Sequence, residues 1–273
     1  MPQVSVVLAT FNEEKNLAKC LDTVQDLADE IVIVDGTSSD KTVEIAKKYG
    51  ARVIVRENPK IFHINKQIAI DAATKDWILQ LDADEHLTPQ LTAEIKSEIR
   101  NPRLPKPGTG GQAKSLPAGR QGEINGYWLP RKNFFLGRFL KKGGQYPDYT
   151  LRLYRKGMGK LPQKDVHEQA EVKGEVGYLK NPLLHYPYKD FSEYFLKWKR
   201  YNSIFADQIK AERSSKSIFG KIFMFPKYLV GLPVFWFLKI YLRHLGFVDL
   251  LPGFVFAFFS GLRFPFSYLM SLK

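Results

Sequence analysis

Three acidic side chains within four residues, Asp82, Asp84 and Glu85, are the strongest candidates for chemistry in this sequence of 273 residues. They come directly after the apolar run Trp77–Leu81. Carboxylate oxygens are the ligands that Mg²⁺ and Mn²⁺ prefer, so this segment could hold a divalent ion against a diphosphate. An isolated Asp-x-Asp pattern is weak, because such residues are commonly solvated loop acids or helix caps. The elements that precede the pattern therefore decide how it is interpreted.

The first ninety residues alternate between strand and helix patterns. Apolar runs predict strands over residues 4–9, 30–35, 52–56 and 77–81, and segments with helical spacing follow the first three. Asn12 is expected to cap the first of these helices. The alternation predicts an α/β fold with a mostly parallel, Rossmann-like sheet flanked by helices. Ligands of such sheets bind beyond the carboxyl ends of the strands, where residues 10–13, 35–40 and 82–85 are expected to lie.

Four motifs carry a resemblance to a known family. They are Val-Ser-Val-Val-Leu-Ala-Thr-Phe-Asn-Glu-Glu at 4–14, Asp35-x-x-Ser38-x-Asp40-x-Thr42, Asn65-Lys66-Gln67-x-Ala69 and Asp82-Ala83-Asp84-Glu85. In this order and spacing they resemble the family 2 glycosyltransferases of the GT-A type, and four ordered motifs are far more specific than one. Further motifs at 135–138, 146–148, 151–155 and 166–168 are similar to the branch that includes lipopolysaccharide core glucosyltransferases.

The resemblance implies a nucleotide-sugar donor, usually a uridine diphosphate sugar, and inversion at the anomeric carbon. It assigns uracil and ribose to Asp35 and to the segment that contains Thr10, Asn12 and Glu13, and it places Lys66 near the base or the phosphates. Asp84, with Asp82 acting through water, would hold Mg²⁺ or Mn²⁺ where negative charge grows on the leaving diphosphate. Turn formation and capping are the alternative roles for Asp35, and a solvated helix position is the alternative for Lys66.

An inverting transfer needs a general base that takes the proton from the acceptor hydroxyl. Glu168 is the first candidate, because it follows a predicted strand, residues 151–154, that is expected to reach the same sheet edge. Asp148 is the second candidate and Asp165 the third. His167 could orient the base or the acceptor, or it could be a structural hydrogen-bonding partner.

Composition changes along the chain predict four regions. Residues 1–100 form the nucleotide-sugar-binding half, 101–122 a flexible Pro/Gly-rich insertion, 123–190 the acceptor-binding half and 191–273 a helical extension. A basic cluster in the third region could meet phosphates of a glycan or glycolipid acceptor, or anionic lipid, or could be a solvated face; its members are Arg131, Lys132, Arg138, Lys141 and Lys142.

The helical extension contains two strongly apolar segments, residues 222–242 and 251–269. Pro226, Pro233 and Lys227 are among the residues expected to interrupt the first segment, and Pro252, Arg263 and Pro265 the second. We therefore expect amphipathic helices that lie in a membrane interface rather than cross it. Packing on the catalytic domain or on a second subunit of a homo-oligomer is the alternative.

The formal charge of +13 indicates an anionic partner such as a nucleotide, a phosphorylated acceptor or an acidic membrane surface. Nucleic acid is the weakest of these, because the sequence contains no nucleic-acid-binding module. Cys20 is the single cysteine, and the first residues lead straight into a core strand without a signal peptide. We expect catalysis in the cytoplasm, at the inner face of the cytoplasmic membrane.

Two other functions fit parts of the sequence. A sugar nucleotidyltransferase would share the sheet and the metal but needs a Gly-rich loop with an Arg after the first strand, and residues 10–14 do not supply it. A non-catalytic scaffold that binds nucleotide at a membrane would keep the sheet without needing a general base.

Overall fold

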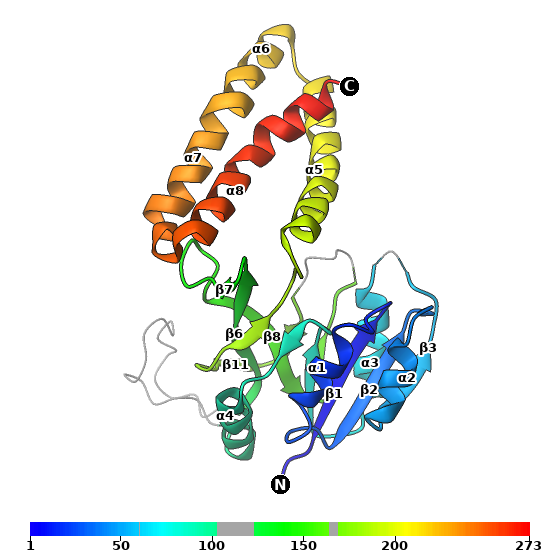
Figure 1. The fold of residues 1–273 in the computed structure, drawn as a ribbon. Coiled ribbons are helices and arrows are strands. Elements are labelled where there is room, and N and C mark those ends of the chain that lie inside the picture. Colours follow the sequence, from blue (N-terminus) through cyan, green and yellow to red (C-terminus); the bar gives the residue numbers. More distant parts are fainter. Residues whose placement is uncertain (60, 103–122, 164–168) are drawn as a thin grey trace. The chain divides into compact units, whose positions relative to one another are not determined.

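The computed structural model describes residues 1–59, 61–102, 123–163 and 169–273 (Figure 1). These residues form two compact units. The first unit consists of residues 1–131 and 149–185, and the second of residues 132–148 and 186–273.

The first hundred residues of the first unit alternate strand and helix, as predicted. The elements are β1 (Val4–Thr10), α1 (Leu17–Asp22), β2 (Glu30–Asp35), α2 (Thr42–Lys48), β3 (Arg52–Val55), α3 (His63–Ala72), β4 (Trp77–Leu81), β5 (Glu85–His86) and α4 (Pro89–Arg100). β1 pairs in parallel with both β2 and β4, and β2 pairs in parallel with β3. The predicted parallel sheet is therefore confirmed.

The later strands make the sheet mixed. They are β6 (Ile124–Phe135), β8 (Asp148–Arg155), β9 (Gly159–Lys160), β10 (Glu171–Val172), β11 (Glu175–Tyr178) and β12 (Leu183–His185). The strand order is β3-β2-β1-β4-β8-β6-β12-β5, with β11 also paired to β6 and a separate β9–β10 ladder. β8 runs antiparallel to β4, so that Trp77 at the start of β4 faces Arg155 at the end of β8.

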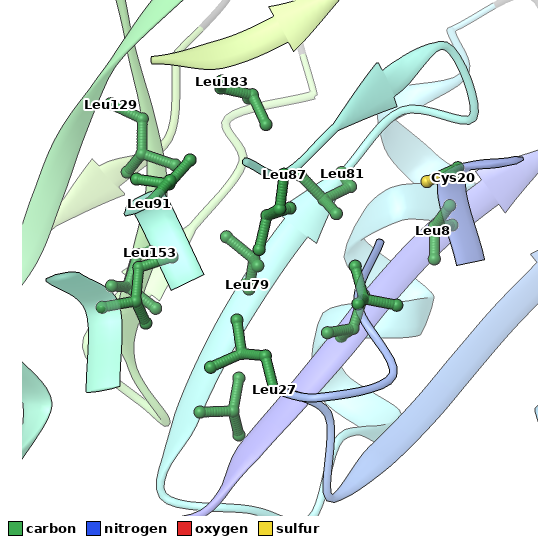
Figure 2. Packing of buried hydrophobic residues seen from close by; sticks show 14 of the residues in the cluster. Leu8, Cys20, Leu27, Leu79, Leu81, Leu87, Leu91, Leu129, Leu153 and Leu183 are labelled. Carbon is green, nitrogen blue, oxygen red and sulfur yellow. The ribbon is translucent and has the colours of Figure 1, made fainter. Parts of the chain in front are cut away.

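The core of the first unit lies between the sheet and its helices. Figure 2 shows leucines from β1, β4, α4, β6 and β8 meeting in one apolar cluster, with Cys20 of α1 at its border. Cys20 is fully buried. α4 is positioned by Thr88, whose hydroxyl accepts a hydrogen bond from the Leu91 N–H, and by Pro89 in the first turn.

One local prediction for the first unit was wrong. Asn12 does not cap a helix, since α1 begins only at Leu17 and Asn12 has a positive φ of 55°. The Asn12 carboxamide oxygen instead accepts a hydrogen bond from the backbone N–H of Ser39 at 2.9 Å. The first loop is thus tied to the loop that follows β2, which sequence spacing could not show.

The second unit is helical apart from the end of β6 and its hairpin partner β7 (Arg138–Phe139). Its helices are α5 (Phe191–Ser214), α6 (Ile218–Pro226), α7 (Leu232–Leu238) and α8 (Leu250–Ser271), with π-helical turns at Lys227–Gly231 and Lys239–Arg243 and a 3₁₀ turn at Gly246–Asp249. α8 packs against both α5 and α7 (Figure 1).

The prolines of the second unit do not interrupt its helices as expected. Pro226 lies inside α6, Pro265 lies inside α8, and residues 218–243 form one helical stretch. Pro233 lies in the first turn of α7, directly after the π-helical turn at Lys227–Gly231, and such a turn lets a helix continue past a proline. By length and composition, two stretches, Ile218–Arg243 and Gly246–Ser271, could cross a membrane.

Candidate functional site

Asp35, the last residue of β2, is held by a set of short hydrogen bonds at the carboxyl edge of the sheet. The parallel register places it beside Thr10 of β1, whose hydroxyl donates to Oδ1 at 3.1 Å. Ser38 donates its N–H to Oδ2 at 2.8 Å and its hydroxyl to Oδ1 at 2.6 Å. Asp35 therefore shapes the loop that follows β2. This is the turn-forming role that the sequence offered as an alternative to nucleotide binding. A carboxylate has about four acceptor positions, so these three bonds leave one unused, and Asp35 itself is only 1% exposed.

Asn12 and Glu13 connect the two neighbouring loops. The Asn12 N–H donates to the Ser38 hydroxyl at 2.8 Å, and the Glu13 N–H donates to the Thr42 hydroxyl at 2.7 Å. The contacts join the segment after β1 to the segment after β2 and hold both open above the sheet edge. Of the predicted donor residues, Thr10, Asn12, Glu13 and Asp35 are thus brought together.

An open recess lies beside these loops. It has a volume of about 600 Å³ and is lined by Thr37, Val55, Arg56, Glu57, Pro59, Ile64 and Asn65. These residues come from the ends of β2 and β3 and from the start of α3, so the recess lies beyond the carboxyl edge where parallel sheets bind ligands.

A cluster of buried charges lies after β4. Lys66 Nζ of α3 forms an ion pair with Asp82 Oδ1, and the Arg152 guanidinium lies 2.7 Å from Asp82 Oδ2 and 2.9 Å from Glu85 Oε1. Arg131 lies 3.4 Å from the same Glu85 oxygen. The Glu85 side chain is fully buried, and Lys66 is only 4% exposed. In this geometry Asp82 bridges two cations, and Lys66 is turned toward Asp82.

The pKa values follow from this arrangement. Burial alone would raise the pKa of Asp82, but Lys66 and Arg152 outweigh burial and hold that pKa well below its usual range. Burial lowers the pKa of Lys66, and Asp82 opposes that shift. Burial would lower the pKa of Arg152 as well, but Glu85 and Asp82 raise it. The shifts of Asp82 and Arg152 therefore both favour the charged forms of these two groups, whereas burial acts against the charged form of Lys66.

The turn that contains Asp84 is fixed from both sides. The Asp82 N–H donates to Glu85 Oε2 at 3.0 Å, and the Glu85 N–H donates back to the Asp82 carbonyl at 3.0 Å. β5 pairs with β12, which places His185 opposite Glu85. His185 Nε2 then lies 3.4 Å from Asp84 Oδ2.

Asp84 and His185 are the residues that could hold a metal. Both side chains keep access to solvent, at 27% and 14% exposed. Within the residues that the structure describes, His, Cys, Asp and Glu side chains form no group of three or more that could hold an ion. The Asp84 carboxylate fits Mg²⁺ or Mn²⁺ that takes its other ligands from a diphosphate and water, because Mg²⁺ in particular is commonly bound through one or two carboxylates. The His185 imidazole is a transition-metal ligand, so it suits Mn²⁺ better than Mg²⁺.

Most of the predicted general-base residues cannot be placed in this geometry, since only Asp148 belongs to the described part of the chain. Glu168, His167 and Asp165 lie outside the described residues. The strand argument for Glu168 was wrong, because β8 is antiparallel and ends beside the amino end of β4. Asp148 begins β8 and belongs to the second unit.

Sequence reasoning missed Arg152 and His185 as site residues. Arg152 lies between Leu151 and Leu153 in a buried strand, and a charge in such a run was an available signal that a buried counter-ion exists. His185 had no comparable signal, because its place beside Asp84 depends on the pairing of two short strands far apart in the chain.

Comparisons with known proteins agree with this description. Residues 5–159 match the model of the family described as Glycosyl transferase family 2. The lipopolysaccharide core biosynthesis glycosyltransferase LpsC of Rhizobium meliloti is 29% identical over 274 aligned residues, which cover 95% of this chain and 91% of LpsC. An uncharacterized glycosyltransferase of Rickettsia typhi is 39% identical over 97 residues, which cover 35% of this chain and 32% of that protein.

Among solved structures, Staphylococcus aureus TarS (residues 1–349) is 15% identical with a TM-score of 0.46, over 98% of this chain and 91% of that chain. Glucosyl-3-phosphoglycerate synthase from Mycobacterium tuberculosis with Mn²⁺ and UDP-glucose is 21% identical with a TM-score of 0.34, over 50% of this chain and 44% of that chain.

The mixed, mostly parallel sheet with its flanking helices is the GT-A-type architecture that the family resemblance implied. Because the family match covers more than half of the chain, the chain belongs to glycosyl transferase family 2.

Proposed function

We propose that this glycosyltransferase moves a sugar from a nucleotide diphosphate donor, a uridine diphosphate sugar, to a glycan of the cell envelope similar to a lipopolysaccharide core. The observation that carries the proposal is the joint position of the recess, Asp35 and Asp84 at the carboxyl edge of one parallel sheet. The acceptor class rests on the similarity to LpsC, which extends over 95% of the chain.

For the donor, we assign the nucleoside to the recess and its rim. Asp35 has acceptor capacity left for the imide N–H of uracil, and Thr10, Asn12 and Glu13 hold the loops that frame the ribose. Lys66 is buried against Asp82, so we propose that it serves the site by fixing that carboxylate and not by direct contact with the nucleotide.

For the diphosphate, we propose that Asp84 and His185 would hold a divalent metal, Mg²⁺ or Mn²⁺. The ion would supply positive charge where the leaving diphosphate becomes more negative. Asp82 then keeps the turn in place through its two cations. The three cations after β4, Lys66, Arg131 and Arg152, face a turn with three carboxylates, Asp82, Asp84 and Glu85, so their formal charges balance. A bound metal would supply the net positive charge that favours a diphosphate.

The proposed transfer inverts the anomeric carbon. The acceptor oxygen forms the new bond as the bond to the diphosphate breaks, and a general base takes the hydroxyl proton. Glu168 remains the proposed base, Asp148 is the second candidate, and His167 is proposed to orient whichever acts.

We further propose that the enzyme works at the cytoplasmic face of a membrane with an anionic surface. The +13 charge and the apolar helices after residue 217 support this location, and the basic cluster at 131–142 would meet phosphates of the acceptor or the headgroups. A homo-oligomer formed through the same helices is the competing arrangement.

Incubation of the full chain with Mn²⁺ and a panel of nucleotide sugars tests the function, because glycosyltransferases slowly hydrolyse their donors. Release of a nucleoside diphosphate from one donor is the expected result. Exchange of pyrophosphate into the nucleotide sugar would instead show a nucleotidyltransferase. Nucleotide binding without any turnover of any donor would show a scaffold.

A further inference from the structure

The helices after residue 217 place large and small side chains in an unusual way. Five of the eight buried residues of α8 are small, namely Gly253, Ala257, Gly261, Ser267 and Ser271. Large apolar residues face outward instead, and they include Leu251 at 68%, Phe254 at 41%, Phe258 at 45% and Leu269 at 53% exposed. A helix in a water-soluble core has the opposite distribution.

The first helical stretch also leaves most of its large apolar side chains exposed, although its few buried residues are large. Across residues 218–243 only Met224, Tyr228 and Ile240 are buried. Phe219 is 76% and Phe223 74% exposed. Exposed apolar area on this scale exceeds what monomeric soluble proteins show and marks a surface that another phase or molecule covers.

The contact between the two stretches is close because of the small residues. A Cβ at Gly261 would lie 2.7 Å from the carbonyl oxygen of Pro233 in α7, which is too near for any side chain. Close packing through small residues is the usual mode of helix association in lipid, where large apolar side chains gain nothing by turning inward. The pair is therefore built like helices whose surroundings are hydrocarbon.

The charged residues of the two helical stretches indicate what kind of surface covers their exposed apolar faces. Residues 216–243 contain five basic residues and no acidic one; the basic residues are Lys216, Lys221, Lys227, Lys239 and Arg243. The ammonium nitrogen of Lys239 lies 4.2 Å from the centre of the Trp236 ring in a cation–π contact, so this charge stands directly beside the apolar surface. Lys216 and Lys227 share Glu212 of α5 as an ion-pair partner, so the face keeps an excess of positive charge. This excess complements anionic lipid headgroups and would repel a second copy of the same face.

α5 excludes a membrane-crossing arrangement. It packs along α8, with Trp198 Nε1 donating to the Phe259 carbonyl at 3.1 Å and the Ser267 hydroxyl donating to the Asn202 carbonyl at 3.0 Å. α5 also presents exposed charges along its length, at Lys199, Arg200, Asp207 and Lys210. If α8 crossed the bilayer, these charges would enter the hydrocarbon with it, at a cost of about 2.5–3.5 kcal/mol each.

We propose that the exposed apolar faces of residues 218–243 and 246–271 are embedded in one leaflet of an anionic bilayer, with the helix axes in the membrane plane and the charged face of α5 in water. The inference deepens the membrane association proposed above by naming the surface and its depth. It rests on the geometry of the second unit alone.

Site-specific labelling tests the depth. The chain has a single cysteine, Cys20, which is fully buried, so an environment-sensitive fluorophore can be attached at introduced cysteines, with the parent chain as the labelling background. Phe223→Cys, Val234→Cys, Phe258→Cys and Leu269→Cys report on the apolar faces. Asp207→Cys and Lys210→Cys on α5 are the matched controls.

With vesicles of an equal mixture of phosphatidylcholine and phosphatidylglycerol, labels at the four apolar positions should shift to the blue and be quenched most by lipids that carry a quencher near the headgroup. The two α5 labels should stay open to quenching by aqueous iodide. Binding should weaken as salt increases and should be weaker on pure phosphatidylcholine.

Three outcomes would overturn the proposal. Strongest quenching of Val234→Cys and Phe258→Cys by lipids with a quencher at the bilayer centre would show a spanning pair. A blue shift that grows with protein concentration without vesicles would show a dimer, and absence of vesicle binding by folded protein would exclude the membrane. None of these readouts needs sugar transfer, so the same labels in an Asp84→Ala chain separate this proposal from the proposed catalysis.

Discussion

The two units of this protein place similar side chains in opposite positions. In the first unit the large apolar residues are inside, with Leu79, Leu81 and Leu153 fully buried, and paired charges lie buried at one edge of the sheet. In the second unit Gly253 and Ala257 are inside, while Phe254 and Phe258 of the same helix are exposed. The difference indicates that the types of side chain that a unit buries depend on the phase that surrounds the unit. Water is the surrounding phase of the first unit, and hydrocarbon is the one proposed for the exposed faces of the second.

The largest expected effect concerns the edge of the sheet. Asp84→Ala should lower the rate of sugar transfer by about 10³-fold or more, because the developing diphosphate charge loses its neutralising partner, while the fold remains intact. Donor turnover measures the rate of sugar transfer, and circular dichroism measures whether the fold remains intact. Asp26→Ala removes an exposed aspartate of the same unit and is the matched control. A near-normal rate for Asp84→Ala would refute the assignment of Asp84.

The next effect tests whether the buried charges of the first unit depend on one another. Glu85→Gln leaves Arg152 and Arg131 without the carboxylate that they share, and we expect a loss of about 3–5 kcal/mol in the free energy of unfolding. Urea unfolding, with hydrogen exchange to locate the affected strands, measures it. Glu44→Gln breaks the exposed pair with Lys48 and should change stability little. Equal effects of the two variants would contradict the importance of burial.

A third variant pair tests the small-residue packing of the second unit. Gly261→Ala forces α7 and α8 apart and should destabilise that unit by about 1–3 kcal/mol. Gly231→Ala is the control, because the nearest atom to its new Cβ is the Pro226 carbonyl oxygen at 3.8 Å. Hydrogen exchange over residues 218–271 measures both. Faster exchange in the Gly231 variant than in the Gly261 variant would refute the packing argument.

The smallest expected effect is a pH dependence of the first unit. The pKa of Asp82 is lower in the folded chain than the usual value of about 4, so ionised Asp82 stabilises the fold above that pH, and the stabilisation is lost as the pH falls. The stability difference between the parent chain and Asp82→Asn should be on the order of 1 kcal/mol at neutral pH and should decline below about pH 4. A difference that stays constant down to pH 3 would contradict the ion-pair account.

Much of the first unit could be predicted because its signals are local. β4 was predicted with its observed bounds, since five consecutive apolar or buried positions after a polar loop identify a central strand. The helix start at Thr88 was also predictable, because the cap and the proline act within one turn. The prediction for Asn12 was wrong because an Asn that caps a helix and an Asn that bridges two loops have the same local sequence. Only the contact with Ser39 in the loop after β2 distinguishes the two roles.

In the second unit the apolar runs were visible but their continuity was not. The prolines suggested breaks, and the helix instead passes Pro226 by widening into a π-helical turn. Whether a helix adjusts in this way depends on the neighbours that hold it, here α8 packed through Gly261. That information is absent from any local window.

Local pattern was sufficient for the parallel strands, for the edge at which ligands bind, and for the acidic turn at residues 82–85, because propensity and periodicity act over a few residues. The partners of that turn came from long-range contacts. Arg152 is 70 residues from Asp82 in the chain, and His185 reaches Asp84 through the pairing of two short strands. Strand direction and register decide such contacts, and both arise only when the whole sheet is assembled.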